Sequence, residues 1–425
     1  MSEATAAREF DVIVWGATGF TGALVAKYLL RQYGVDGDLR WAIAGRSQEK
    51  LDALRGELDL HENDLETMVA DSFDSGALND LAQRTRVVLT TVGPYALYGS
   101  ELVEACVENG THYCDLAGEV QWIRKMIDEH QERATQTGAR IVHCCGFDSV
   151  PMDIGVWFLQ EEARKRFGHY CQSITLLVKA TKGSASGGTV ASLINLIEES
   201  RKDRAIAKIL VHPYSLNPEG EREGPDQRDQ QGVLYNDDAK SWTAPFVMAA
   251  VNTKVVRRSH ALLGYPYGKD FRYQEAVLTG AGPAGWAKGA AMTAALGALV
   301  AGASFSATRK LLQKFILPEP GEGPDEEMQQ EGFFNLMQIG LLPDGQILRS
   351  RITGDQDPGY GSTSKMLSEC AVCLAKDDID VGGGVWTPAS SMAKPLLERL
   401  QANAGLSFEI SCLLYTSDAA DEFCH

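Results

Sequence analysis

Three glycines near the start of the chain stand where a phosphate-binding turn would need them. Gly16, Gly19 and Gly22 follow an apolar run at 10–15 and precede a stretch at 23–30 with helical periodicity. Strand, glycine turn and helix together direct N–H groups at a pyrophosphate, because the first N–H groups of a helix have no partner within it. Gly16 suits a tight turn, Gly19 a close backbone approach, and Gly22 close packing of helix on strand. The candidate dinucleotide-binding residues of this turn are Gly16, Ala17, Thr18, Gly19, Phe20, Thr21 and Gly22.

The end of the next predicted strand indicates which dinucleotide is preferred. Arg46 and Ser47 follow the apolar run at 39–44, where NAD-preferring folds carry a carboxylate for the ribose 2′-hydroxyl. A guanidinium and a hydroxyl suit a 2′-phosphate, which a carboxylate would repel. The sequence therefore predicts NADP(H) in preference to NAD(H). The competing interpretation of Arg46 is a solvated residue at the start of a helix, which Ser47 would cap.

Further cofactor contacts are expected where later strands end. Asp71 follows the third predicted strand, a position that commonly lies beside the adenine. Val92 ends the fourth predicted strand, Gly93 and Pro94 follow it, and all three are expected to line the cofactor crevice. The alternative for Gly93-Pro94 is a rigid turn without a binding role.

Two residues at the same edge of the predicted sheet are candidate catalytic groups. Tyr95 could donate a hydrogen bond to an enolate-like oxygen or protonate a product carbon. Asp148 lies at the predicted domain junction, where a substrate would enter, although it or Ser149 could instead cap the helix that follows. Further candidates from these loops are Tyr98, Asp115, Glu119 and His143, and the last is expected to be a core histidine. The chain has no Tyr-x-x-x-Lys pair after the fourth strand and no zinc-ligand set, so no metal is expected.

Six strand–helix alternations precede residue 150. The strands are predicted at 10–15, 39–44, 67–70, 86–92, 111–115 and 139–144. This order is typical of a doubly wound parallel sheet, so the fold class is α/β. The expected division is a Rossmann domain at 1–150, an α+β substrate domain at 151–385, a helix and strand at 386–410 that could return to the Rossmann domain, and a non-native tail at 411–425. The tail looks like a translated sequencing-adaptor stretch.

Composition favours a cytoplasmic protein that does not bind nucleic acid. The formal net charge is −17, which disfavours nonspecific binding to a polyanion. Residues 1–10 lack the apolar stretch of a signal peptide. The nine cysteines are scattered, with no pair of Cys or His at zinc spacing to accompany Cys370 and Cys373, so they are interpreted as reduced core residues.

The apolar segment at 289–317 suggests a contact with lipid. No charged residue lies between Lys288 and Arg309, a length that could span a bilayer, yet alanine, glycine, serine and threonine dominate it. Small residues at four-residue spacing from Ala290 to Ser306 predict a ridge for close helix packing. Three interpretations stay open: a peripheral helical hairpin on a membrane or lipid, a buried or homodimer-interface helix, and a true membrane span.

Several motifs resemble those of one known family. In chain order they are Gly16–Gly22, Ala44-Gly45-Arg46, Val92–Tyr95, Asp115–Glu119, Gly146–Pro151, Thr353–Gly361 and Gly382–Ala389. This order resembles the saccharopine dehydrogenase-like oxidoreductases, a family that includes the trans-acting enoyl reductases, which act on lipid-linked polyketide chains. The resemblance covers about residues 10–410. It implies an NADP-dependent oxidoreductase and indicates the family more strongly than the substrate.

Three functions fit these observations. The first is NADPH-dependent reduction of an unsaturated, lipid-like acyl substrate, and the apolar segment favours it. The second is reduction of an amino-acid-derived imine, which should present several arginines to substrate carboxylates. The arginines available for this are Arg201, Arg204, Arg222, Arg228, Arg257, Arg258 and Arg272. The third is a non-catalytic NADP-binding protein at a lipid surface.

Overall fold

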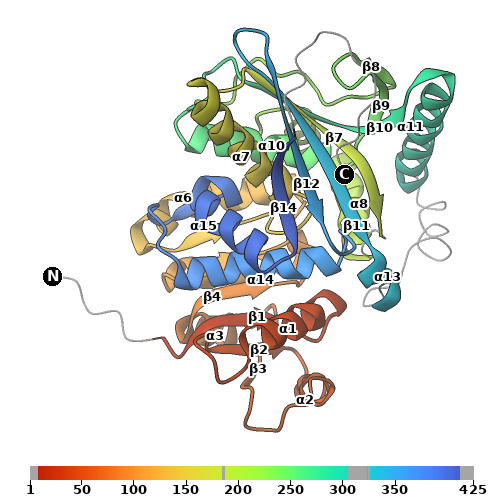
Figure 1. The fold of residues 1–425 in the computed structure, drawn as a ribbon. Coiled ribbons are helices and arrows are strands. Elements are labelled where there is room, and N and C mark those ends of the chain that lie inside the picture. Colours follow the sequence, from red (N-terminus) through yellow and green to blue (C-terminus); the bar gives the residue numbers. More distant parts are fainter. Residues whose placement is uncertain (1–7, 184–186, 305–322, 324–325, 412–425) are drawn as a thin grey trace.

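The computed structural model describes residues 8–183, 187–304, 323 and 326–411, and these form two seven-stranded sheets (Figure 1). Sheet A consists of β1 (Phe10–Trp15), β2 (Trp41–Gly45), β3 (Thr67–Val69), β4 (Thr85–Thr90), β5 (His112–Cys114), β6 (Arg140–Val142) and β13 (Gly384–Trp386). Its spatial order is β13-β6-β5-β4-β1-β2-β3, and every pair is parallel. This arrangement confirms the predicted Rossmann fold; β13, at the edge of the sheet, was not predicted.

Sheet A is covered on both faces, which explains why its strands are apolar throughout. Its helices are α1 (Phe20–Tyr33), α2 (Gln48–Glu57), α3 (Ser75–Arg84), α4 (Tyr95–Tyr98), α5 (Ser100–Glu108) and α6 (Val120–Thr137). Alternate residues of β1 serve opposite faces: Val12 and Val14 pack in the cluster that contains α1, whereas Ile13 and Trp15 pack in the cluster that contains α3 and α5.

Sheet B and the helices around it make up most of the described chain after β6. Its strands are β7 (Ser173–Lys182), β8 (Leu234–Asn236), β9 (Ser241–Pro245), β10 (Arg272–Gly280), β11 (Phe333–Leu341), β12 (Ile347–Gly354) and β14 (Leu406–Ser411), in the order β14-β12-β11-β7-β10-β9-β8. The helices are α7 (Val150–Phe167), α8 (Gly187–Lys202), α9 (Arg204–Val211), α10 (Ala249–Leu262), α11 (Gly282–Ser304), α13 (Glu326–Glu331), α14 (Gly361–Lys376) and α15 (Pro388–Ala402). Only β7 and β10 pair in parallel among these strands. The α+β character expected of the second domain is confirmed.

The chain returns from sheet B to sheet A through α14. This helix contacts α1, β1, β4 and β5, so a late segment completes one face of the Rossmann sheet. Glu369 of α14 accepts hydrogen bonds from the hydroxyls of Tyr28 and Tyr33 on α1, both at 2.7 Å. Lys376, at the end of α14, forms a 2.8 Å ion pair with the buried Asp11, the one charged residue of β1.

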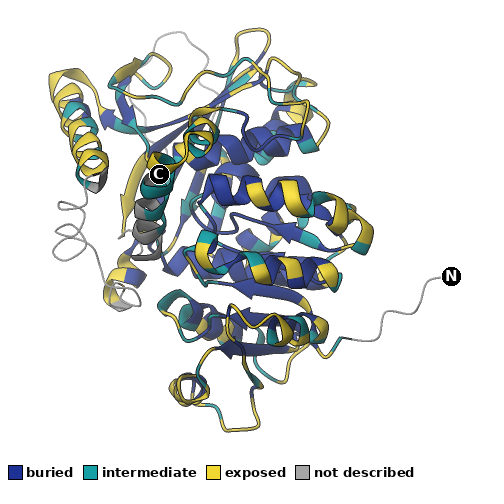
Figure 2. Ribbon diagram, turned by 180° about the vertical axis from the view of Figure 1, so that it is seen from behind, coloured by how far each residue is buried: buried dark blue, intermediate teal, exposed yellow. Residues whose placement is uncertain are grey.

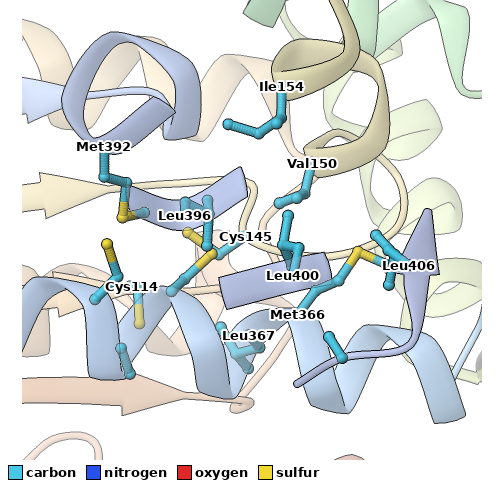
Figure 3. Packing of buried hydrophobic residues seen from close by; sticks show 14 of the residues in the cluster. Cys114, Cys145, Val150, Ile154, Met366, Leu367, Met392, Leu396, Leu400 and Leu406 are labelled. Atoms are coloured by element: carbon cyan, nitrogen blue, oxygen red, sulfur yellow. The ribbon is translucent and has the colours of Figure 1, made fainter. Parts of the chain in front are cut away.

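A continuous core joins the two sheets (Figure 3). Cys114 and Cys145 of the sheet A side lie among Met366 and Leu367 of α14, with Leu396 of α15 close by. The described cysteines are free and buried, as expected of reduced core residues. The predicted domain boundaries at 150 and 385 stay a prediction. The predicted tail lies outside the described residues except for Ser411, which ends β14.

Helix α11 lies at the side of the molecule and is largely exposed (Figure 2). It contacts β9, β10 and α8. The close approach is made by Gly285 and Gly289, where a Cβ would lie 2.0 Å from the Gly280 carbonyl oxygen and 3.2 Å from Thr279 Oγ1, respectively. Ala294 and Ala298 of the predicted small-residue ridge are exposed, so their packing against another helix stays a prediction.

The described part of the apolar segment ends with α11, and residues 305–317 lie outside the described residues. None of the helices in the described part of the chain combines the length and the apolar character that crossing a membrane requires.

Candidate active site

The glycine turn after β1 has two glycines that the fold itself requires and one that it does not. Gly16 has φ +85°, and a Cβ there would lie 2.5 Å from Cγ2 of Val92. A Cβ on Gly22 would lie 2.1 Å from the carbonyl oxygen of Gly16. At Gly19 the nearest atom to a Cβ is that same oxygen, at 3.4 Å. The protein has room for a side chain at Gly19, so the glycine there leaves space that a pyrophosphate would need.

The N-terminus of α1 carries no cap of its own. Gly19 occupies the N-cap position, and among the described residues no side chain hydrogen-bonds to the first turn. The N–H groups of Phe20, Thr21 and Gly22 begin the helix at the carboxyl end of β1, between the two halves of the sheet. Free N–H groups and the positive end of the helix dipole at this switch point suit a pyrophosphate.

The residues predicted around the adenosine end lie on the same edge. Arg46 is exposed directly after β2, and no residue in the described ranges pairs with its guanidinium. Ser47 caps α2 by accepting from Lys50 N at 3.4 Å, as the competing interpretation expected. Asp71 is exposed and its Oδ1 accepts from Phe73 N at 3.0 Å. Their contacts with a cofactor stay predictions, although a free guanidinium fits a 2′-phosphate.

The segment after β4 is held by a buried carboxylate. Val92, Gly93 and Pro94 lead into α4, and Glu119 accepts from the N–H groups of Tyr95 at 2.7 Å and Ala96 at 2.9 Å. Burial raises the pKa of Glu119, while these hydrogen bonds oppose the rise. The sequence offered Glu119 as a candidate for the chemistry, but it could not show this pairing, because the loops after β4 and β5 meet only in the folded sheet.

The Tyr95 hydroxyl is already engaged. It donates to the Thr90 carbonyl oxygen at 3.2 Å and accepts from Leu116 N at 3.1 Å, so it joins the ends of β4 and β5. The side chain is buried and its ring stacks on Trp122, with centroids 5.6 Å apart. Burial raises the pKa of Tyr95 well above its usual value. The catalytic role predicted for Tyr95 stays a prediction.

Asp148 differs from the other carboxylates of this edge. It is half-buried in the turn between β6 and α7, and its carboxylate has no hydrogen-bond or ion-pair partner among the described residues. Burial raises the pKa of Asp148 to about 6. The expected cap of α7 is wrong, because neither Asp148 nor Ser149 caps it with a side chain; Ser149 Oγ donates instead to Asn252 Oδ1 at 3.2 Å. A carboxyl that gains a proton near pH 6 can serve as a general acid.

His143 and Asp115 form a buried pair beneath these loops. His143 is 2% exposed, as expected of a core histidine, and its Nδ1 lies 2.7 Å from Asp115 Oδ2. Asp115 also accepts from Ala117 N at 2.9 Å and Cys144 N at 3.1 Å. The pair therefore fixes the loops after β5 and β6 and leaves little of Asp115 for a substrate.

Three residues of the Thr353–Gly361 motif and its helix complete the edge, and sequence reasoning gave them no role. The ring of Tyr360 packs edge-on against Phe20 at the start of α1, with centroids 4.7 Å apart. Thr363 Oγ1 accepts from Phe147 N at 3.1 Å, which seats the Asp148 turn against α14. Asp357 accepts from the N–H groups of Tyr360 and Gly361. The motif contributed to the family resemblance, but its position beside the start of α1 follows only from the packing of α14 on sheet A.

Residues 12–142 match the family model of the saccharopine dehydrogenase NADP binding domain. With the parallel sheet and the uncapped α1, this match defines an NADP(H)-dependent oxidoreductase of the Rossmann type and confirms the cofactor prediction.

Similarity to named relatives shows to which group of this family the chain belongs. Trans-acting enoyl reductases of Mycobacterium ulcerans and Mycobacterium leprae are 35% and 36% identical over 93% and 92% of this chain and 96% of their own. A Mycobacterium tuberculosis protein named for the same activity is 38% identical over 96% of this chain and 98% of its own. The chain therefore belongs to the saccharopine dehydrogenase-like oxidoreductases, in the group that contains the trans-acting enoyl reductases.

A solved structure extends the likeness to the whole fold. Apo saccharopine dehydrogenase (L-Glu forming) from Saccharomyces cerevisiae matches with a TM-score of 0.51 over 95% of this chain and all of that chain. Identity is 10%, so this match shows the fold alone.

Proposed function

We propose that this protein uses NADPH to reduce the carbon–carbon double bond of an unsaturated, lipid-like acyl substrate. The observation that carries the proposal is the similarity to trans-acting enoyl reductases along almost the full length of both chains. Bound NADPH supplies a hydride, and the protein must hold the acceptor and provide a proton.

Asp148 is the proposed proton donor. Hydride addition to an enoyl group leaves negative charge on the substrate, and a nearby acid must neutralise it. Asp148 is at the carboxyl edge of sheet A with a pKa of about 6 and no described partner to hold its proton. The Tyr95 hydroxyl has both a donor and an acceptor from the backbone, so we propose that Tyr95 positions the loop.

Two of the seven arginines considered for an amino-acid-derived imine are engaged within the protein. Arg257 forms a 2.7 Å ion pair with Asp226, and Arg258 donates to the carbonyl oxygens of Leu216 and Val385 at 2.6 Å each. Both are buried, so neither is free to bind a substrate carboxylate. This engagement removes two groups that could bind substrate carboxylates, whereas Arg228 and Arg272 are exposed.

The test follows NADPH oxidation with trans-2-enoyl thioesters of increasing chain length and with a mixture of a 2-oxo acid and an amino acid. We expect oxidation with the long-chain enoyl thioester. Asp148→Asn should lower kcat by about 100-fold or more with little change in NADPH affinity. Above pH 6, kcat/KM should fall about tenfold per pH unit as Asp148 loses its proton. The exposed Asp270→Asn is the matched control. Turnover of the oxo-acid mixture alone would contradict the proposal.

We also propose that the exposed apolar surface of α11 contacts lipid at a membrane periphery. Trp286 is 52% exposed at its start and Val300 44% exposed towards its end, and α11 has no charge after Lys288. Tryptophan and lysine at one end of an apolar helix suit the boundary between head groups and acyl chains. A homodimer through α11 is the competing occupant.

Co-sedimentation with anionic liposomes tests this proposal. The intact chain should pellet with them, and Trp286→Ser with Val300→Ser should reduce the pelleted fraction while NADPH binding persists. Light scattering on the same samples reports mass. A stable dimer that the double substitution converts to monomer, without liposome binding, would assign the surface to a second copy of the chain.

A further inference from the structure

Glu119 links the cofactor crevice to the second domain through one carboxylate. Its Oε1 accepts from Tyr95 N at 2.7 Å and from the Ser192 hydroxyl at 2.9 Å, and its Oε2 accepts from Ala96 N at 2.9 Å. Glu119 is 1% exposed. A carboxylate this deeply buried depends on its donors, because each lost hydrogen bond leaves a desolvated oxygen unpaired.

The three donors come from two separate regions. Tyr95 and Ala96 directly follow Val92–Pro94, the segment predicted to line the cofactor crevice. Ser192 lies on α8, which belongs to the sheet B half of the molecule. Oε1 is therefore shared between a backbone group of the crevice and a side chain of α8.

A second contact seats α8 on the same stretch of the Rossmann sheet. Gln121, two residues after Glu119, donates through Nε2 to Glu199 Oε2 at 2.8 Å. Glu199 lies two helical turns beyond Ser192. Two hydrogen bonds at this spacing fix the direction of α8 across the start of α6 as well as its position.

We propose that Glu119 is a positioning residue that couples the seating of α8 to the shape of the crevice segment at 93–96. When α8 is seated, Ser192 completes the donor set of Glu119, and Glu119 holds Tyr95 and Ala96 in place. When α8 leaves, Oε1 is exposed to water and its hold on Tyr95 N weakens. Cofactor binding and α8 seating then favour each other, because coupling between two sites is reciprocal. The inference needs only the NADP(H) crevice and is independent of the acyl substrate.

Ser192→Ala tests the coupling, with NADPH affinity and amide hydrogen exchange as readouts. Loss of one shared hydrogen bond should raise the NADPH Kd by about three- to tenfold and speed exchange at Tyr95 and Ala96. In the native protein, NADPH should slow exchange within 192–202; in Ser192→Ala this protection should disappear. Ser192→Thr, which keeps the hydroxyl, should restore both effects. A role in local packing alone would not make α8 respond to NADPH.

Two further variants keep the test decisive. Lys202→Ala removes an exposed 2.9 Å contact with Glu198 inside α8 and should change neither readout. Glu119→Gln should change both NADPH affinity and amide exchange more than Ser192→Ala does, because the NH2 group of the amide cannot accept a hydrogen bond from a backbone N–H. If Glu119→Gln fails to fold, Ser192→Ala by itself still tests the coupling between NADPH binding and the seating of α8. Ser192→Ala that behaves like Lys202→Ala would overturn the coupling, and neither result depends on which substrate is reduced.

Discussion

The N-termini of α1 and α14 meet at the carboxyl edge of sheet A, and side chains of the described residues bind the N–H groups of only one of them. At α14, the Asp357 carboxylate accepts from Tyr360 N at 2.9 Å and Gly361 N at 2.8 Å. At α1, the N-cap residue is Gly19, and no side chain among the described residues takes this place. The rings of Phe20 and Tyr360 are 4.7 Å apart, so the two ends share one environment. A helix N-terminus becomes an anion site only where the chain supplies no anion of its own.

The same distinction separates the carboxylates of this edge. Asp357 and Glu119 each hold two backbone N–H groups, and Asp115 holds two as well as His143. Asp148 has no partner in the described parts of the chain. Carboxylates that accept hydrogen bonds from the backbone hold the loops of the site in place. A carboxylate without such partners is available to contact a ligand or substrate.

The glycines of the turn offer the sharpest test of this comparison. Gly19→Val should raise the NADPH Kd by roughly 100-fold with the fold retained, because the new side chain occupies the pyrophosphate space. Gly22→Val should instead destabilise the protein by about 3 kcal/mol or more, since its Cβ meets the Gly16 carbonyl oxygen. Titration with NADPH and thermal unfolding separate the two. Undiminished binding in folded Gly19→Val would place the phosphates elsewhere.

Arg46, the cation after β2 for which the described residues provide no partner, should set cofactor preference. The native protein should bind NADPH more tightly than NADH, and Arg46→Asp should shift the ratio of their Kd values by about 10- to 100-fold towards NADH. Lys27→Asp, an equal charge change on the outer face of α1, is the control. Equal affinities that Arg46→Asp leaves unchanged would remove Arg46 from the site.

Removing the cap of α14 should affect stability more than binding. Asp357→Ala leaves buried N–H groups unpaired and should cost about 1–3 kcal/mol in the free energy of unfolding. Asp357→Asn keeps one acceptor oxygen and should cost less. NADPH affinity in the folded variants should change little. Loss of NADPH binding at unchanged stability would mean that α14, not α1, carries the anion site.

Asp148 should show its lack of partners as a pH-dependent stability difference. Its pKa rises on folding from 3.8 to about 6, so the folded state binds the proton more tightly than the unfolded state. The stabilisation from protonation is present below pH 4 and is lost as pH rises from 4 to 6. Between pH 4 and 6 the free energy of unfolding of Asp148→Asn should therefore rise relative to that of the native protein. The expected rise is about 1–2 kcal/mol, after allowance for the partial exposure of Asp148. Denaturant unfolding at pH 4, 5, 6 and 7 measures this, and a constant difference would contradict a raised pKa.

The sequence predicted the parts of this protein that depend on local order. A buried strand, three glycines and a helix within 10–33 specify the turn, because period, spacing and backbone freedom are local properties. Arg46 directly follows the second strand, and the carboxyl ends of parallel strands meet at one edge of the sheet. Its position in the sequence was therefore enough to indicate NADP(H). The six strands from β1 to β6 followed from alternation along the chain.

Tertiary structure alone decided what lies around that turn. Helix α14, more than 300 residues after α1, covers sheet A and brings Asp357 and Tyr360 to the start of α1. Glu119, Tyr95 and Ser192 meet only because α8 crosses from the other sheet. Likewise, the absence of a described partner for Asp148 is a property of its neighbours in space. Sequence patterns report periodicity over a few turns, whereas burial, pKa and the pairing of a carboxylate depend on contacts between residues far apart in the chain.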